Sequence, residues 1–320
     1  MRIIFLGTPQ IAVPTLEKLI DWPKGEVVAV VTQPDKPKGR GKHLHMPPTK
    51  IVAEDFGIPV LQPIKLSKSP ETVQAMKDLQ PEVLVMVAFG QILKQPVLEM
   101  APYGVVNLHA SLLPKLRGPA PINWAIINGE SSTGITTMFT DAGVDTGDML
   151  LKREVPIEKD MNAEELGQVL AKAGANLVIE TLEHMLVGSL RPEKQDNDQS
   201  THAPMMGKEL GIIDWQKPAQ SIHNLVRGLV PWPGTSTTFD GKPLKIVKTR
   251  LPYRLVDISG QTSKPGEIVN IDDVLTIACG EDGSDRLEII DVQPANKARM
   301  HAKDWANGVH LKPGQVLGQL

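Results

Sequence analysis

Two polar residues stand at the end of an apolar segment in the first half of the chain. In residues 105–109, read as a strand, Asn107 and His109 interrupt valine and leucine. Residues two apart on a strand point to the same face, so an amide and an imidazole project together. Open α/β sheets place their ligand sites at the carboxyl ends of such strands. Taken alone, however, an Asn-x-His pair is more often a strand end beside a hydrogen-bonded core histidine.

A glycine-rich segment supplies a carboxylate for this pair. Residues 141–150 read Asp-Ala-Gly-Val-Asp-Thr-Gly-Asp-Met-Leu, between two predicted strands. By itself the segment is typical of an acidic hairpin loop, because Asp and Gly are favoured in turns. Together with Asn107 and His109 it can bring Asp145 beside the imidazole. Such a group can donate hydrogen bonds to a developing oxyanion and accept a proton. The sequence therefore predicts Asn107, His109 and Asp145 as catalytic residues.

The two segments resemble motifs of the folate-dependent formyltransferase family. Asn107-x-His109 continues into Ser-Leu-Leu-Pro, and Asp145 continues into Thr-Gly-Asp. In that family Asn, His and Asp form the catalytic group. The resemblance implies that 10-formyltetrahydrofolate binds as the formyl donor, a substrate and not a permanently bound cofactor. It also implies a folate site in the cleft beside Ser111, Leu112, Leu113 and Pro114, with Phe89 and Gly90 in the pocket for the ring.

A basic loop narrows the resemblance to one branch of the family. Gln-Pro-Asp at residues 33–35 is followed by Gly-Arg-Gly-Lys at residues 39–42. This pattern resembles the loop that methionyl-tRNA formyltransferases insert at the acceptor end of tRNA. The branch implies transfer of the formyl group to the amino group of methionyl initiator tRNA, in translation initiation. The expected tRNA contacts are Lys38, Arg40 and Lys42.

The resemblance covers nearly the whole chain, with some departures. Short motifs recur at the family's spacing: Arg117-Gly118, Asn123-Trp124, Ile213-Asp214-Trp215, Pro231-Trp232-Pro233 and Gln293-Pro294. The pairs Gln10-Ile11 and Lys115-Leu116 and the single residues Pro119 and Asn296 differ from the usual pattern, but none of them removes a catalytic group.

Other classes of protein account for fewer of these features. A formyltetrahydrofolate hydrolase or an amino-sugar formyltransferase keeps Asn107, His109 and Asp145 without needing the basic loop. A noncatalytic RNA-binding protein on the same fold has no need of all three groups. A dinucleotide site is disfavoured, because the glycine after the first strand is not followed by the second and third glycines of the fingerprint. His43 and His45 have no neighbouring Cys or carboxylate pair, so no metal site is expected.

The elements that must position these residues alternate between strands and helices in the first half. Strands are predicted at 2–6, 26–32, 83–88, 105–109, 134–139 and 149–154, and helices at 12–20, 70–79, 120–128 and 162–186. Asn162 can cap the last helix with Glu165 three residues on. We expect an α/β fold with a doubly wound, mostly parallel, Rossmann-like sheet in a catalytic domain over residues 1–188. A polar linker, 189–207, then precedes an OB-like β-barrel for tRNA binding, 208–320, that contains one helix near 219–227.

Composition sets the class of protein. The chain has 320 residues, 41% of them hydrophobic and 22% charged, with one cysteine and a formal net charge of -3. No apolar segment approaches the roughly 20 residues that span a bilayer, and a single cysteine cannot form an intramolecular disulfide. We therefore expect a cytoplasmic, monomeric enzyme with no membrane or metal partner. Because the net charge is slightly negative, contact with RNA has to come from a local basic patch.

Overall fold

The chain divides into two compact units that are interleaved in sequence. In the computed structural model, residues 1–38, 43–252 and 263–318 are described. Unit 1 comprises Met1–Pro121, Ser132–Pro156 and Gly167–Ala203, and unit 2 comprises Ile122–Ser131, Ile157–Leu166 and Pro204–Leu320. Two segments from the first half of the chain thus belong to unit 2. The domain limits 1–188 and 208–320 stay a prediction.

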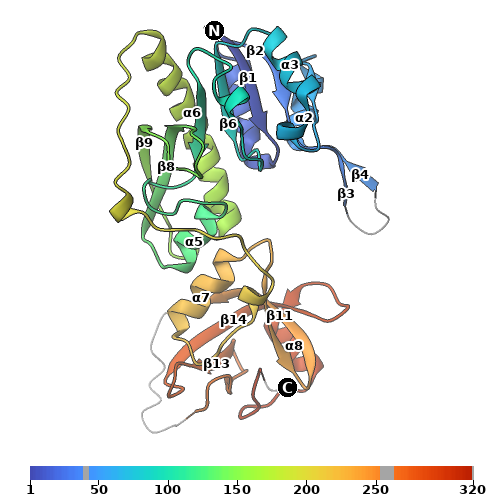
Figure 1. Cartoon of the computed structure of the whole chain (residues 1–320). Helices are drawn as coiled ribbons and strands as arrows, with labels where there is room; N and C mark the ends of the chain where they lie inside the picture. Colours follow the sequence, from blue (N-terminus) through green and yellow to red (C-terminus); the bar gives the residue numbers. More distant parts are fainter. Residues whose placement is uncertain (39–42, 253–262, 319–320) are drawn as a thin grey trace. The chain divides into compact units, whose positions relative to one another are not determined.

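A seven-stranded, mostly parallel sheet forms the centre of unit 1 (Figure 1). Its order is β5-β2-β1-β6-β7-β8-β9, parallel from β5 to β7 and antiparallel from β7 to β9. Four successive residues of β1, at positions 3–6, have no exposed surface, so both faces of the sheet are covered there. The predicted α/β class is confirmed. The strands are β1 (Arg2–Gly7), β2 (Glu26–Val31), β5 (Val60–Leu61), β6 (Val83–Val87), β7 (Val105–His109), β8 (Ser132–Phe139) and β9 (Met149–Pro156).

The helices begin where local residue types favour them. α6 (Ala163–Leu186) has the predicted cap: Asn162 Oδ1 accepts hydrogen bonds from the N–H groups of Glu164 and Glu165, at 2.9 and 3.0 Å. Glu165 Oε2 in return accepts from the Asn162 N–H at 2.9 Å. α2 was not predicted, although its first residue is a proline, which is favoured there. The other helices of the first half are α1 (Val13–Ile20), α2 (Pro48–Asp55), α3 (Pro70–Asp78), α4 (Gln95–Leu98) and α5 (Pro121–Ile127).

Unit 2 contains an antiparallel sheet, as predicted, in the order β10-β11-β14-β13-β12 with β15 paired to β14. Its core includes Trp215, Ile277, Leu287 and Trp305. α8 was not predicted, because it has seven residues, of which only Ala302, Trp305 and Ala306 are buried. The elements are α7 (Ala219–Gly228), β10 (Thr235–Phe239), β11 (Lys242–Arg250), β12 (Ile268–Asn270), β13 (Leu275–Cys279), β14 (Asp285–Pro294), β15 (Met300–His301) and α8 (Ala302–Gly308).

The polar segment predicted as a linker is attached to unit 1 along much of its length. Glu193 and Met149 exchange two backbone hydrogen bonds of 2.8 Å. Arg117 donates its N–H to Thr201 O at 2.9 Å and accepts at its carbonyl from the Ala203 N–H at 2.7 Å. A polar composition therefore marks an exposed segment here, and one that is bound to the sheet and its loops.

Helices long and apolar enough to cross a membrane do not occur in the part of the chain that the structure describes.

The α6 cap makes a testable contribution to stability. Replacing Asn162 with Ala removes the acceptor for two helix N–H groups, which typically costs about 1 kcal/mol. Asn162→Ala should therefore lower the melting temperature, measured by circular dichroism. Asn307→Ala, at an exposed position inside α8, is the control and should melt close to the parent. Equal melting of the Asn162 variant and the parent would contradict the cap.

Candidate active site

β7 carries Asn107 and His109 on one face, and both side chains are buried, 8% and 6% exposed respectively. Asn107 lies opposite Met86 of β6 and Met138 of β8. Within the described residues the Asn107 amide makes no hydrogen bond. Buried polar groups normally have a partner, so this amide is available to a ligand.

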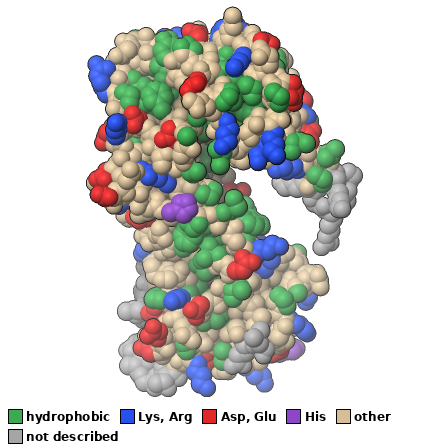
Figure 2. Space-filling model, in the orientation of Figure 1, with side chains coloured by type: hydrophobic (Ala, Val, Ile, Leu, Met, Phe, Trp, Pro, Cys, Tyr) green, Lys and Arg blue, Asp and Glu red, His purple; other side chains and the backbone are tan. Residues whose placement is uncertain are grey.

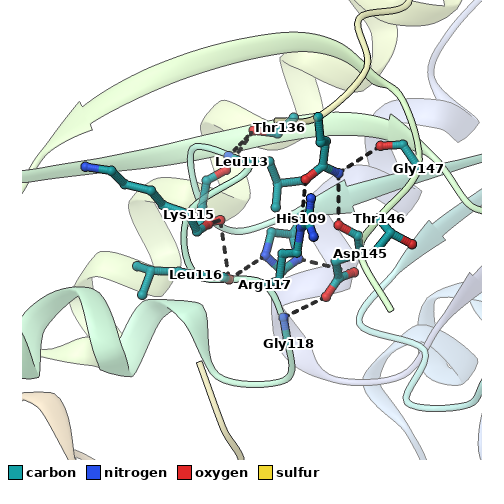
Figure 3. Close-up of polar contacts among 12 residues, drawn as sticks. His109, Leu113, Lys115, Leu116, Arg117, Gly118, Thr136, Asp145, Thr146 and Gly147 are labelled. Atoms are coloured by element: carbon teal, nitrogen blue, oxygen red, sulfur yellow. Dashed lines mark hydrogen bonds and ion pairs between the residues drawn. The ribbon is translucent and has the colours of Figure 1, made fainter. Parts of the chain in front are cut away.

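His109 is held from two sides by two different loops (Figure 3). Its Nε2 lies 2.9 Å from the carbonyl oxygen of Leu116, and its Nδ1 lies 3.6 Å from Asp145 Oδ1. Both ring nitrogens thus face oxygen atoms, and a ring with a proton on each nitrogen has an acceptor for both. The longer of the two distances suits an ion pair better than a strong hydrogen bond. Asp145 is therefore in reach of the imidazole, as the sequence predicts.

The second oxygen of Asp145 ties its loop to the loop that follows β7. Asp145 Oδ2 accepts a hydrogen bond of 2.9 Å from the Gly118 N–H. Gly118 has φ of +110°, and a Cβ there would come within 2.9 Å of Ala203 O. Only glycine fits this position without a backbone shift. One carboxylate therefore faces the imidazole with one oxygen and fixes a backbone amide with the other.

The four residues expected beside the folate differ in how much surface they offer. Ser111 is fully buried and its hydroxyl donates to Lys115 O at 2.6 Å. Leu113 is buried against Met138 and Met149. Leu112 and Pro114 are half-buried and have surface left for a ligand.

In the loop after β6 the backbone of Gly90 is exposed, whereas the ring of Phe89 is buried in the core. Phe89 is 1% exposed and belongs to the core of unit 1, while Gly90 is exposed with φ of +76°. The Phe89 carbonyl oxygen accepts a hydrogen bond from Gln33 Nε2 at 3.1 Å. Any ring contact in this loop therefore depends on Gly90 and on backbone groups.

The basic loop forms a hairpin of unit 1, with β3 (Lys36–Lys38) antiparallel to β4 (His43–His45), and projects from the sheet (Figure 1). Arg40 and Lys42 lie outside the described residues, and so does the side chain of Lys38.

At the base of the hairpin, Lys50 Nζ donates to Asp35 at 2.9 Å and Gln62 Nε2 donates to it at 2.7 Å. These hydrogen bonds, from Gln62 first and then Lys50, hold the pKa of Asp35 below its ordinary value. The charge of Lys50 is therefore paired within the fold. On the face drawn in Figure 2, Lys and Arg side chains are interspersed with Asp and Glu.

Groups outside the segments of Asn107, His109 and Asp145 also hold this site, and they were not predicted. The Leu116 N–H donates to Thr201 Oγ1 at 2.8 Å, and Gln195 Nε2 donates to Asp145 O at 2.9 Å. Thr201 and Gln195 lie in the segment predicted as a linker. Their residue types carry no catalytic signal, and the backbone groups of Leu116 and Gly118 carry none either. Across residues 1–38, 43–252 and 263–318, no group of three or more His, Cys, Asp or Glu could hold a metal ion.

Comparison with known proteins identifies the class. A formyl transferase family model matches residues 1–182, and a model of the formyl transferase C-terminal domain matches residues 205–310. A sugar 3N-formyl transferase, WlaRD, has the same fold, with a TM-score of 0.66 and 20% identity over 93% of this chain and 99% of that one. The chain is thus a formyl transferase by family, with the fold of that class.

Curated relatives show which branch this is. The methionyl-tRNA formyltransferase of Geobacter metallireducens is 50% identical, over 99% of each chain. That of Caldanaerobacter subterraneus subsp. tengcongensis is 47% identical, over 99% of this chain and 100% of its own. The chain belongs to the methionyl-tRNA formyltransferase family.

A substitution at Gly147 tests whether formyl transfer requires the observed backbone position of the Asp145 loop. A Cβ at Gly147 would lie 1.8 Å from the backbone oxygen of Phe139, so the loop must shift to admit a side chain. Because small misplacements of catalytic groups cost up to about a hundredfold, Gly147→Ala should lower kcat for formyl transfer by roughly tenfold or more. Gly308→Ala, where a Cβ meets only open space, is the matched control. Normal kcat in the Gly147 variant would show that the loop tolerates displacement.

Proposed function

We propose that the chain moves the formyl group of 10-formyltetrahydrofolate to the amino group of methionyl initiator tRNA, giving N-formylmethionyl-tRNA, and that it acts as a monomer. The full-length relatives support formyl transfer to methionyl-tRNA, and the structure of WlaRD with 5-N-formyl-THF supports a formylated folate as the donor. One observation carries the site: a buried Asn107 amide without a partner among the described residues shares a strand face with His109, which is held by Leu116 and Asp145. Such an arrangement fits a reaction that develops negative charge on an oxygen.

The reaction needs two bond changes and one proton transfer. The free amine of the methionyl group attacks the formyl carbon, and the C=O electrons move to oxygen in a tetrahedral intermediate. The bond between that carbon and the folate nitrogen then breaks, the carbonyl re-forms, and the folate nitrogen takes up a proton. An α-amino group has an ordinary pKa near 8, so a useful fraction is unprotonated at neutral pH. The protein's main task is therefore to stabilise the oxyanion and to receive the proton that the amine loses.

Asn107 is the proposed donor that is ready for the oxyanion, since its amide has no hydrogen bond to give up among the residues that the structure describes. The His109 Nε2 proton is committed to Leu116 O in the structure, so it reaches the substrate only by sharing or leaving that bond. Asp145 orients the ring from Nδ1 and can accept the amine proton directly or through a water. In this scheme Asn107 and His109 act on the oxygen and Asp145 acts on the nitrogen side.

The substrates are assigned to two parts of unit 1. Leu112, Pro114 and Gly90 offer surface to the folate, whereas Ser111, Leu113 and Phe89 support it from buried positions. The hairpin of β3 and β4 is assigned to the acceptor end of the tRNA, through Lys38, Arg40 and Lys42. Lys50 is left out of this set because Asp35 already pairs with it.

Loss of either oxyanion donor should slow the chemical step. Asn107→Ala and His109→Ala should each lower kcat by about a hundredfold or more, the usual effect of removing one such donor. Binding of methionyl-tRNA, measured by filter retention, should stay within about threefold, because the hairpin is untouched. The formylation assay uses labelled 10-formyltetrahydrofolate. Near-normal turnover in either variant would remove that residue from the oxyanion site.

The choice of acceptor separates the proposal from other reactions of the same donor. The protein is given 10-formyltetrahydrofolate with methionyl initiator tRNA, uncharged tRNA or an amino sugar, and the formylated product is identified. Formyl transfer to methionyl initiator tRNA alone is expected. Release of formate in all mixtures would indicate a hydrolase, and transfer to the sugar would indicate an amino-sugar enzyme.

The hairpin should give tRNA use its dependence on salt. Each phosphate contact on a single strand contributes about 0.7 to the slope of log affinity against log salt. Arg40→Ala with Lys42→Ala should therefore flatten the slope by roughly one unit, with folate binding unchanged. The rate at subsaturating methionyl-tRNA is measured over a range of salt concentrations. Lys18→Ala with Lys172→Ala removes the same charge from exposed helix positions as a control. An equal effect of both double variants would assign the change to net charge and not to this loop.

A further inference from the structure

Gln195 connects the two loops that hold His109. Its Nε2 donates to the carbonyl oxygens of Asp145, at 2.9 Å, and Gly147, at 2.8 Å. Its Oε1 accepts from Arg117 Nε at 2.9 Å. The oxygen and the nitrogen of this half-buried amide thus both form hydrogen bonds, with residues that are 48, 50 and 78 positions away in the chain.

The backbone that Gln195 contacts lies next to the groups facing the imidazole. Asp145 has φ of +54° and Leu116 has φ of +56°, a region that non-glycine residues rarely adopt. Such a backbone persists only when its surroundings hold it in place. Two hydrogen bonds from Gln195 hold the carbonyls of the Asp145 loop, and its bond to Arg117 reaches the residue that follows Leu116.

Two further contacts anchor Arg117, the hydrogen-bond partner of Gln195, to the same segment. Arg117 Nη2 donates to Asn197 Oδ1 at 3.0 Å, and the Arg117 backbone N–H donates to Thr201 O at 2.9 Å. Arg117 is therefore fixed at its backbone and at its guanidinium by residues 195–201. Because Gln195 bonds to this fixed arginine, its side chain has little freedom to move with the Asp145 loop.

We propose that Gln195 is a positioning residue for formyl transfer, which sets the Asp145 carboxylate at its place beside His109. The proposal rests on the proposed function above. It gives the predicted linker a role in the reaction without any contact to substrate. Gln195 acts through Asp145, so its loss should affect the chemical step and leave the binding of both substrates nearly unchanged.

The first test compares three variants of the full chain. Gln195→Ala removes all three hydrogen bonds. Gln195→Glu keeps the shape but replaces the donor amide with a carboxylate that repels both carbonyl oxygens. Each should lower kcat by about ten- to a hundredfold, with KM for folate and for methionyl-tRNA within roughly threefold. Gln199→Ala is the control and should keep the parent's kcat, because among the described residues the Gln199 side chain bonds only to Asp196 in the same segment. Parent-like kcat in the two Gln195 variants would overturn the proposal.

A double-mutant cycle separates positioning from general damage to the fold. Asp145→Asn suits the backbone because asparagine tolerates positive φ, but it removes the charge that Gln195 is proposed to place. In that background Gln195→Ala should cost less than about threefold in the single-turnover rate. The same loss in both backgrounds would show a structural role that does not act through Asp145, and would overturn the proposal.

A spectroscopic measurement keeps the inference testable even if the proposed acceptor is wrong. The ring ¹⁵N signals of His109, assigned by their loss in His109→Asn, should move in Gln195→Ala and stay in Gln199→Ala. If the parent does not formylate methionyl-tRNA, the proposed function fails, while moved ring signals still support positioning. Unmoved ring signals in Gln195→Ala would overturn the inference whatever the acceptor is.

Discussion

The site depends on one buried imidazole that is held by oxygen atoms from two loops. The Leu116 carbonyl lies 2.9 Å from one nitrogen of His109 and the Asp145 carboxylate lies 3.6 Å from the other. Because the ring is 6% exposed, water offers it little alternative hydrogen bonding. The positions of both loops therefore decide the ring's orientation and the direction of its protons. Asn107, next to it on the same strand face, has no hydrogen-bond partner among the described residues.

Both oxygen atoms belong to residues with an unusual backbone. A non-glycine residue at positive φ typically costs about 1–3 kcal/mol, so Leu116 and Asp145 need support from their surroundings. That support comes largely from the polar segment after α6, through Gln195 and Thr201. The segment therefore connects the two units and also holds the backbone of Leu116 and Asp145 through hydrogen bonds.

Recognition of a long anionic acceptor has to be local in this protein. The net charge is -3, and on the face drawn in Figure 2 basic side chains are interspersed with acidic ones. The sequence concentrates cations in residues 36–42, the segment proposed for tRNA, and in the structure the pairing of Lys50 with Asp35 lies at the base of the hairpin of β3 and β4. Affinity that arises from such a confined patch is sensitive to salt, whereas the buried Asn107 and His109 are screened much less.

Local pattern was enough to predict the α/β class, most strands of the first half and the cap of α6 at Asn162, because periodicity and capping depend on residues a few positions apart. Residue types and motif spacing also singled out Asn107, His109 and Asp145, which the structure places on one strand face and its facing loop; their catalytic roles stay a prediction. Only the tertiary structure decided that Phe89 is core, that Lys50 is paired and that the predicted linker braces the site. It also decided which backbone oxygen faces His109. These features rest on contacts such as Leu116 with Thr201, 85 positions apart. A backbone carbonyl or a glutamine has the same chemistry everywhere in a sequence, and acquires a particular role only from the groups that folding brings beside it.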